Sequence, residues 1–114
     1  MKQTKLTLLN TSILTVYGTY VFEPLTLDEA KALIVEFQKT NRKIQSVIGH
    51  QTTADLLTSL LNYRVAVNRM EFKQTVDDVA LVFKLCGRTP EGRVLSREEL
   101  EAVGYEFGLL TRLS

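Results

Sequence analysis

The sequence predicts an α/β fold, a single small domain in which a mixed β-sheet is flanked by helices. Its 114 residues suit one domain, which we expect to span residues 1–114 and to bury enough apolar surface to fold. Two segments open with a helix-capping motif, and short apolar runs of strand length lie around them. This mixture of helical segments and strands along the chain is typical of α/β domains.

The first quarter of the chain predicts two extended segments. Residues 5–9 form an apolar run that ends in the turn-forming triplet Asn-Thr-Ser at 10–12, as a buried strand ends at a loop. Residues 18–25 should also be extended, because Pro24 disfavours helix at the residue before it.

Helical periodicity begins at the next segment. Thr26 followed three residues later by Glu29 is a capping box, in which each residue satisfies a backbone amide of the other. Apolar side chains then recur at i, i+3, i+4 and i+7, at Ala30, Leu33, Ile34 and Phe37. We therefore expect a helix over about Leu27 to Lys39.

A second helix is expected from Gln51 or Thr52 to about Asn62. Its apolar positions keep helical spacing, at Ala54, Leu57, Leu60 and Leu61. Thr52 or Thr53 could cap its free amides. His50, the only histidine of the chain, would then lie at a helix N-terminus.

Three further segments have the pattern of strands. The apolar stretch SVIG (46–49) could form a brief strand before the second helix. Residues 63–73 alternate between apolar and polar side chains, while residues 79–86 form an apolar run long enough for a central strand. The last two could pair as a hairpin across residues 74–78.

The C-terminal third predicts a loop, a short helix and a strand. Residues 87–93, GRTPEGR, hold two glycines and a proline and cannot extend either neighbour. Ser96 and Glu99 form a second capping box, which opens a helix through about Val103. Residues 105–113 can close the fold as a last strand.

The charge and the cysteine content exclude several classes of function. Fourteen Lys and Arg against thirteen Asp and Glu leave a net charge of +1, too little for a broad basic face that binds long nucleic acid. One cysteine, Cys86, allows no intramolecular disulfide, and with one histidine no ordinary zinc shell can form, so we expect no metal and no other cofactor. P-loop, dinucleotide and nucleophile-elbow motifs are also absent from the sequence.

The N-terminal apolar stretch is not expected to be a signal peptide or a membrane span. Polar residues at 10–12 interrupt it before it reaches the ~20 apolar residues of a span. We therefore expect an intracellular protein, located in the cytoplasm.

His50 is the first candidate for chemistry, because imidazole titrates near neutral pH and can move a proton in either direction. Free amides at a helix N-terminus attract phosphate, which would place an anion beside it. The alternative is a surface histidine next to a turn.

Other candidates are polar side chains in loops and at strand ends. Arg69 lies where the alternation of its segment falters, and its alternative role is a solvated charge. Arg88 and Glu91 lie in the glycine-flanked loop after the expected central strand, a usual position for binding residues. The turn after the first strand could offer phosphate-binding donors or be an ordinary turn; it comprises Asn10, Thr11 and Ser12.

Four segments in register resemble one family of small proteins from viruses, plasmids and prophages, the viral type III anti-CRISPR ring nucleases. These segments are LLNTSIL, SVIGHQTTADLL, VNRMEF and GRTPEGRVLSREEL, and the likeness runs over nearly the whole chain. The resemblance implies a homodimer that binds cyclic tetra-adenylate across its two-fold axis. It also implies cleavage without metal into linear di-adenylates with 2′,3′-cyclic phosphate ends, so that CRISPR effectors lose their activator.

The resemblance also implies roles for individual residues. His50 and Glu91 match catalytic positions of the family, and Arg69 and Arg88 match its ligand-binding arginines. The segment Asn10 to Ser12 matches its phosphate-contacting turn, with altered spacing. Lys84 stands where the family has a glutamine. No long nucleic acid and no membrane is expected as a partner.

Elementary chemistry is compatible with this assignment. A symmetric dimer presents each residue twice, so two arginines per subunit give four guanidiniums for the four phosphates of the ring. Cleavage of RNA without metal needs an in-line 2′-hydroxyl, an acid for the departing 5′-oxygen and cations facing the phosphorus. Two alternatives stay open: a protein that sequesters the cyclic nucleotide, and a small dimeric regulatory protein that binds no nucleotide.

Overall fold

The computed structural model describes residues 4–10, 16–76, 78–86 and 96–114, which form five strands and three helices. In chain order these are β1 (Lys5–Leu9), β2 (Tyr20–Leu25), α1 (Leu27–Lys39), β3 (Lys43–Ser46), α2 (Gln51–Leu61), β4 (Asp78–Leu85), α3 (Arg97–Val103) and β5 (Tyr105–Arg112).

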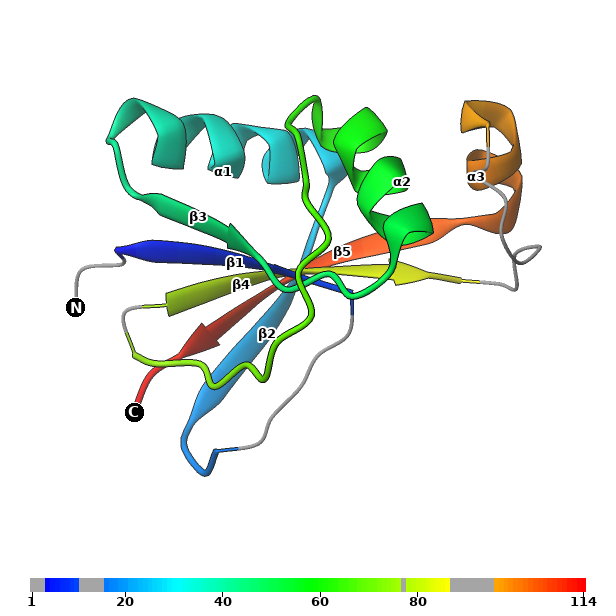
Figure 1. Cartoon of the computed structure of the whole chain (residues 1–114). Coiled ribbons are helices and arrows are strands. Elements are labelled where there is room, and N and C mark those ends of the chain that lie inside the picture. Colours follow the sequence, from blue (N-terminus) through cyan, green and yellow to red (C-terminus); the bar gives the residue numbers. More distant parts are fainter. Residues whose placement is uncertain (1–3, 11–15, 77, 87–95) are drawn as a thin grey trace.

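The strands form one mixed sheet in the order β2-β5-β4-β1-β3 (Figure 1). β1 runs parallel to both of its neighbours, β3 and β4, whereas β5 is antiparallel to β4 and β2. The parallel pairs are joined through the helices, as parallel connections require. The expected α/β class with a mixed sheet flanked by helices is confirmed.

The main core lies between the sheet and the helices. α1 and α2 lie on the same side of the sheet, and α3 lies beyond one end of it (Figure 1). Alternate residues of β4 point into this core, and the residues between them join a second cluster on the opposite face. Burial on both faces explains why residues 79–83 of β4 form an unbroken apolar run, as the sequence predicted for a central strand.

Two of the helices begin at the predicted capping boxes. Thr26 and Glu29 exchange side-chain and backbone hydrogen bonds at α1, and Ser96 and Glu99 do the same at α3. Residue for residue, α1 has the predicted bounds. Because a capping box is formed by residues three apart, tertiary packing is not needed to specify it.

The predicted strand over residues 63–73, and its hairpin with β4, are wrong. Within the described chain, residues 62–76 contain no strand and only one isolated bridge, between Ile48 and Val67. Other groups satisfy this backbone: the Val65 amide donates to Thr58 Oγ1 over 2.9 Å, and the Asn68 amide donates to the Ile48 carbonyl. The apparent alternation arises because single residues, such as Phe72, dock on the core while their neighbours face solvent.

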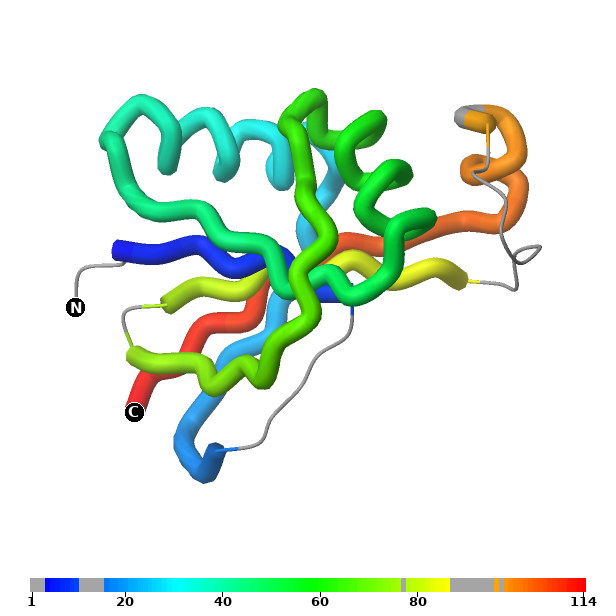
Figure 2. Tube along the Cα trace, in the orientation of Figure 1, coloured from blue at the N-terminus to red at the C-terminus, as the bar shows by residue number. Residues whose placement is uncertain are grey.

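Residues 62–76 instead connect the two faces of the sheet (Figure 2). From the end of α2 the segment passes the β3 side of the sheet, and Phe72 then packs against Leu9 and Val82 on the face opposite α1 and α2. The brief strand expected at 46–49 lies earlier, as β3, and pairs with β1 from Lys43 onward.

None of the described helices could span a bilayer, since each is too short or too polar for the purpose.

Candidate functional site

The carboxyl ends of the three parallel strands define one edge of the sheet. Asn10 follows β1, His50 follows β3 after a short connection, and Cys86 follows β4. Because parallel strands end on the same side, the chain segments after them meet there, and open α/β sheets bind ligands at this edge. The predicted site residues that the structure describes all lie near it or on the connection beside it.

His50 is the N-cap residue of α2, which confirms its predicted place at a helix N-terminus. Its backbone is extended, and its carbonyl accepts the first helical hydrogen bond from Ala54, over 3.0 Å. Its side chain makes no capping bond and is exposed. Thr52 and Thr53, expected as caps, instead lie inside the first turn of the helix.

The start of α2 therefore differs from the starts of α1 and α3. Those two helices have a capping hydroxyl and two acidic residues in the first turn, which satisfy and complement the terminal amides. α2 has neither a side-chain cap nor an acid in its first turn. Among the described helices, α2 therefore has the N-terminal amides best suited to donate hydrogen bonds to an external anion such as phosphate.

Arg69 lies against the residue before His50. Its Nε donates to the carbonyl oxygen of Gly49 over 2.8 Å. A Cβ atom on Gly49 would lie only 3.3 Å from the Arg69 Cγ, so glycine allows this close approach. Neither Nη atom has a hydrogen-bond or ion-pair partner among the described residues. The guanidinium is therefore positioned through Nε while its outer nitrogens can bind an anion.

The connection that carries Arg69 is anchored to the end of β3. Asn68 donates from its amide to Ile48 O and from Nδ2 to Ser46 O, both over 2.8 Å. Ser46 Oγ donates in turn to Ala66 O over 2.6 Å. These bonds join residues twenty or more positions apart in sequence, and they hold Arg69 next to Gly49, the residue before His50. No periodic signal in the sequence indicated this pairing.

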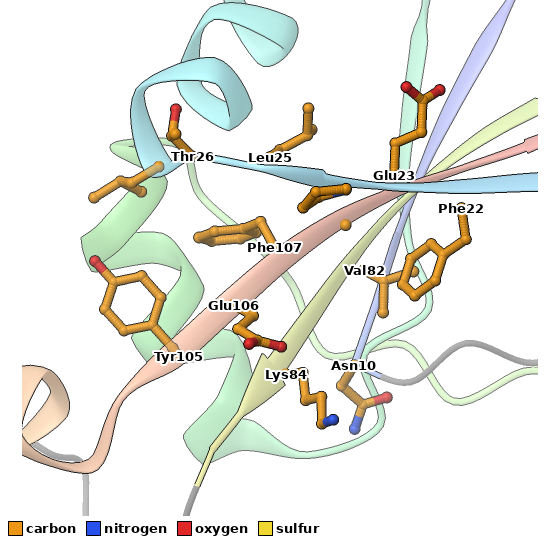
Figure 3. Close-up of a pocket in the computed structure, with 13 residues that line it drawn as sticks. Asn10, Phe22, Glu23, Leu25, Thr26, Val82, Lys84, Tyr105, Glu106 and Phe107 are labelled. Carbon is orange, nitrogen blue, oxygen red and sulfur yellow. The ribbon is translucent and has the colours of Figure 1, made fainter.

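Asn10 lines a cavity of about 740 Å³, which is formed mainly by residues of β2, β4 and β5 (Figure 3). Its thirteen lining residues include three charged side chains, Glu23, Lys84 and Glu106, as well as Phe22, Tyr105 and Gly108. Sequence reasoning did not identify this cavity. The signal that could have pointed to it is Gly108, a glycine inside an apolar strand, which often marks a close approach to another group.

The remaining predicted site residues lie outside the described residues. They are Thr11 and Ser12, in the segment after β1, and Arg88 and Glu91, in the segment after β4. The structure thus brings Arg69 to Gly49, the residue before His50, and places Asn10 at the same edge. Within the described chain, no three His, Cys, Asp or Glu side chains gather as a metal site would require.

Comparisons with known proteins agree on one family. A family model described as STIV B116-like matches residues 6–107. The chain is 38% identical over 105 residues to the "Uncharacterized protein YddF" of Bacillus subtilis, covering 92% of this chain and 94% of that protein. It is 38% identical over 95 residues to the "Uncharacterized protein ORF117" of Acidianus two-tailed virus, covering 82% and 79%.

One further viral relative and one solved structure agree. The "Uncharacterized protein 26" of a Sulfolobus islandicus filamentous virus is 35% identical over 86 residues, covering 75% of this chain and 69% of that protein. The structure of B116 of Sulfolobus turreted icosahedral virus superposes with a TM-score of 0.76 at 22% identity, covering 94% and 97% of the two chains. At that identity the likeness shows a shared fold.

Proposed function

Because this chain belongs to the STIV B116-like family, which has viral members, we propose that it is a ring nuclease. In this proposal it binds cyclic tetra-adenylate and cleaves it without metal, so that type III CRISPR effectors lose their second messenger. The four sequence segments that resemble anti-CRISPR ring nucleases supply the identity of the substrate. The local chemistry at α2 supports the reaction.

The observation that carries this proposal is the contact of Arg69 with Gly49, directly before His50, at the start of α2, which has no side-chain cap. In this proposal the first amides of α2 bind a phosphate next to His50, and the Nη atoms of Arg69, which have no partner among the described residues, bind the same anion. Neither side chain has a structural task that occupies its reactive atoms: the imidazole makes no capping bond, and Arg69 uses only Nε.

The proposed reaction is an internal transesterification. A ribose 2′-oxygen attacks the adjacent phosphorus, the bond from phosphorus to the 5′-oxygen breaks, and His50 donates a proton to that 5′-oxygen. The 2′-hydroxyl loses its proton to Glu91, or to solvent water where Glu91 instead orients His50 or holds Arg88. Arg69 and Arg88 stabilise the charge that develops on the phosphoryl oxygens. One cut per subunit gives two linear di-adenylates with 2′,3′-cyclic phosphate ends.

The proposal requires a symmetric dimer. A two-fold axis through the ring relates two of its phosphates to the other two, so that each subunit presents one His50 and one Arg69 to a scissile bond. This arrangement concentrates positive charge at one site while each chain keeps a net charge of only +1.

The test is an incubation of the protein with cyclic tetra-adenylate in excess chelator, followed by chromatography of the products. We expect di-adenylates with cyclic phosphate ends. His50→Ala should lower the rate by roughly 10²- to 10⁴-fold while binding changes much less. Arg69→Ala should weaken binding more than it lowers the rate of cleavage. The matched control is Arg64→Ala, because Arg64 is an exposed arginine on the same connection.

A sequestering protein is the second candidate. It is favoured by one observation: no described residue hydrogen-bonds to the imidazole of His50 to orient it. Wild-type protein that binds cyclic tetra-adenylate and releases it intact, at the same rate as His50→Ala, would establish sequestration and contradict catalysis.

A further inference from the structure

The cavity beside Asn10 occupies a notch in the sheet. The ladder between β2 and β5 ends at the pair Leu25–Phe107, whereas β5 begins two residues earlier, at Tyr105. Those two residues, Tyr105 and Glu106, pair with β4 on one side, and no described strand covers their other side. Side chains from both faces of the sheet therefore line the opening, whose volume lies within the usual range for small-molecule sites.

An exposed aromatic ring forms one wall of this cavity. Phe22 is 56% exposed, although it belongs to a strand. Its ring occupies the space of a missing side chain at Gly108, because a Cβ there would clash with Phe22 Cε1 and lie 2.6 Å from Cζ. The ring is thus held on the Gly108 backbone, and its remaining surface is available to a planar ligand.

Two opposite charges lie next to this ring. Lys84 and Glu106 are direct cross-strand partners, on the face of the sheet that also carries Phe22 (Figure 3). Neither side chain has an ion-pair or hydrogen-bond partner among the described residues. Their charged groups can therefore serve a ligand that offers both a hydrogen-bond donor and an anion.

We infer that this cavity binds the base and phosphate of an adenine nucleotide. The base stacks on Phe22, and the Glu106 carboxylate accepts a hydrogen bond from the exocyclic amine. The ammonium of Lys84 and the amide of Asn10 contact the phosphate. That the nucleotide is an adenylate of the cyclic substrate rests on the proposed function, and in the dimer two such cavities hold two of the four bases. Asn10 lines the cavity and is also the first residue of the segment that the family resemblance assigns to phosphate contact.

The first experiment measures stacking. Binding of cyclic tetra-adenylate is measured by calorimetry in a His50→Ala background, and binding of adenosine 5′-monophosphate by NMR shifts of the Gly108 amide. Phe22→Ala should weaken the binding of each by about 5- to 150-fold, the range for losing one base–aromatic stack. Phe22→Trp should restore it. Val21→Ala, on the opposite face of the same strand, is the matched control and should bind as wild type.

The second experiment tests the polar contact and does not depend on the fold of Phe22 variants. Inosine 5′-monophosphate has a carbonyl oxygen where adenine has the amine, so it should bind more weakly than the adenine nucleotide. Glu106→Gln should reduce this difference, because an amide can donate to the carbonyl. Equal affinities for the two nucleotides in the wild type would overturn the assignment of Glu106.

The outcomes separate this inference from the proposed function. Adenosine 5′-monophosphate binding at Gly108 without cleavage of cyclic tetra-adenylate supports the cavity and rejects the ring nuclease. Cleavage with unchanged affinities in Phe22→Ala rejects the cavity and supports the nuclease. A Phe22→Ala protein that changes from dimer to monomer assigns the ring to a subunit contact and overturns the inference. Absence of binding by both nucleotides rejects both.

Discussion

At the level of single residues, Gly49 leaves room for Arg69 directly before His50. A methyl group at position 49 would lie 3.3 Å from Arg69 Cγ, tighter than ordinary packing, so the arginine side chain would have to shift by a few tenths of an ångström. Gly49→Ala should therefore move the guanidinium and weaken binding of cyclic tetra-adenylate about ten-fold, as the loss of one charged hydrogen bond would. Calorimetry on Gly49→Ala, Arg69→Ala and the double variant measures this. Full additivity of the two effects would show that Gly49 does not act through Arg69.

A second residue-level prediction concerns stability far from the site. Thr7, fully buried, donates to Asp78 Oδ1 over 2.9 Å and accepts from Gln45 Nε2 over 3.0 Å, which links β1 to both of its neighbours. Thr7→Val keeps the shape but leaves a buried carboxylate and an amide each without one partner. We expect a loss of about 1–3 kcal/mol in the free energy of unfolding, measured in urea. Thr7→Ser retains the hydroxyl, so a loss as large as that of Thr7→Val would contradict this account.

At the level of elements, the start of α2 lacks the side-chain cap that α1 and α3 have. Serine is among the best N-cap residues, and histidine does not cap α2 here. His50→Ser should therefore stabilise the protein by about 1 kcal/mol while abolishing cleavage. Thermal unfolding and product chromatography on one preparation measure both. Thr26→Ala, which removes the working cap of α1, is the control and should lower stability by a similar amount. A His50→Ser protein of unchanged stability would show that the α2 amides are satisfied in another way.

At the level of the whole molecule, the proposed site is complete only in a symmetric pair. Sedimentation at micromolar concentration should give twice the 12.9 kDa of one chain. Mixed dimers of wild type and His50→Ala should cleave one of the two scissile bonds and release a linear tetra-adenylate, because each subunit acts on its own phosphate. A monomer with and without cyclic tetra-adenylate would exclude the proposed geometry.

Local signals in the sequence determined the bounds of α1, the capping boxes of α1 and α3, the central strand β4 and the place of His50 before α2. These features depend on residues three or four apart, or on burial on both faces of a strand, and such patterns are written in the chain itself.

Tertiary structure alone decided the path of residues 62–76, the contact of Arg69 with Gly49 and the seat of Phe22 on Gly108. The contacts of Arg69 with Gly49 and of Phe22 with Gly108 join residues twenty or more positions apart, as do the bonds of residues 62–76 to Ser46 and Ile48. The connection could satisfy its backbone with Thr58, Ser46 and Ile48 as well as with a strand, so its alternating pattern did not specify a ladder. Hydrogen-bond partners that the rest of the fold places nearby favoured the irregular connection over a strand. The same bonds position Arg69 beside Gly49.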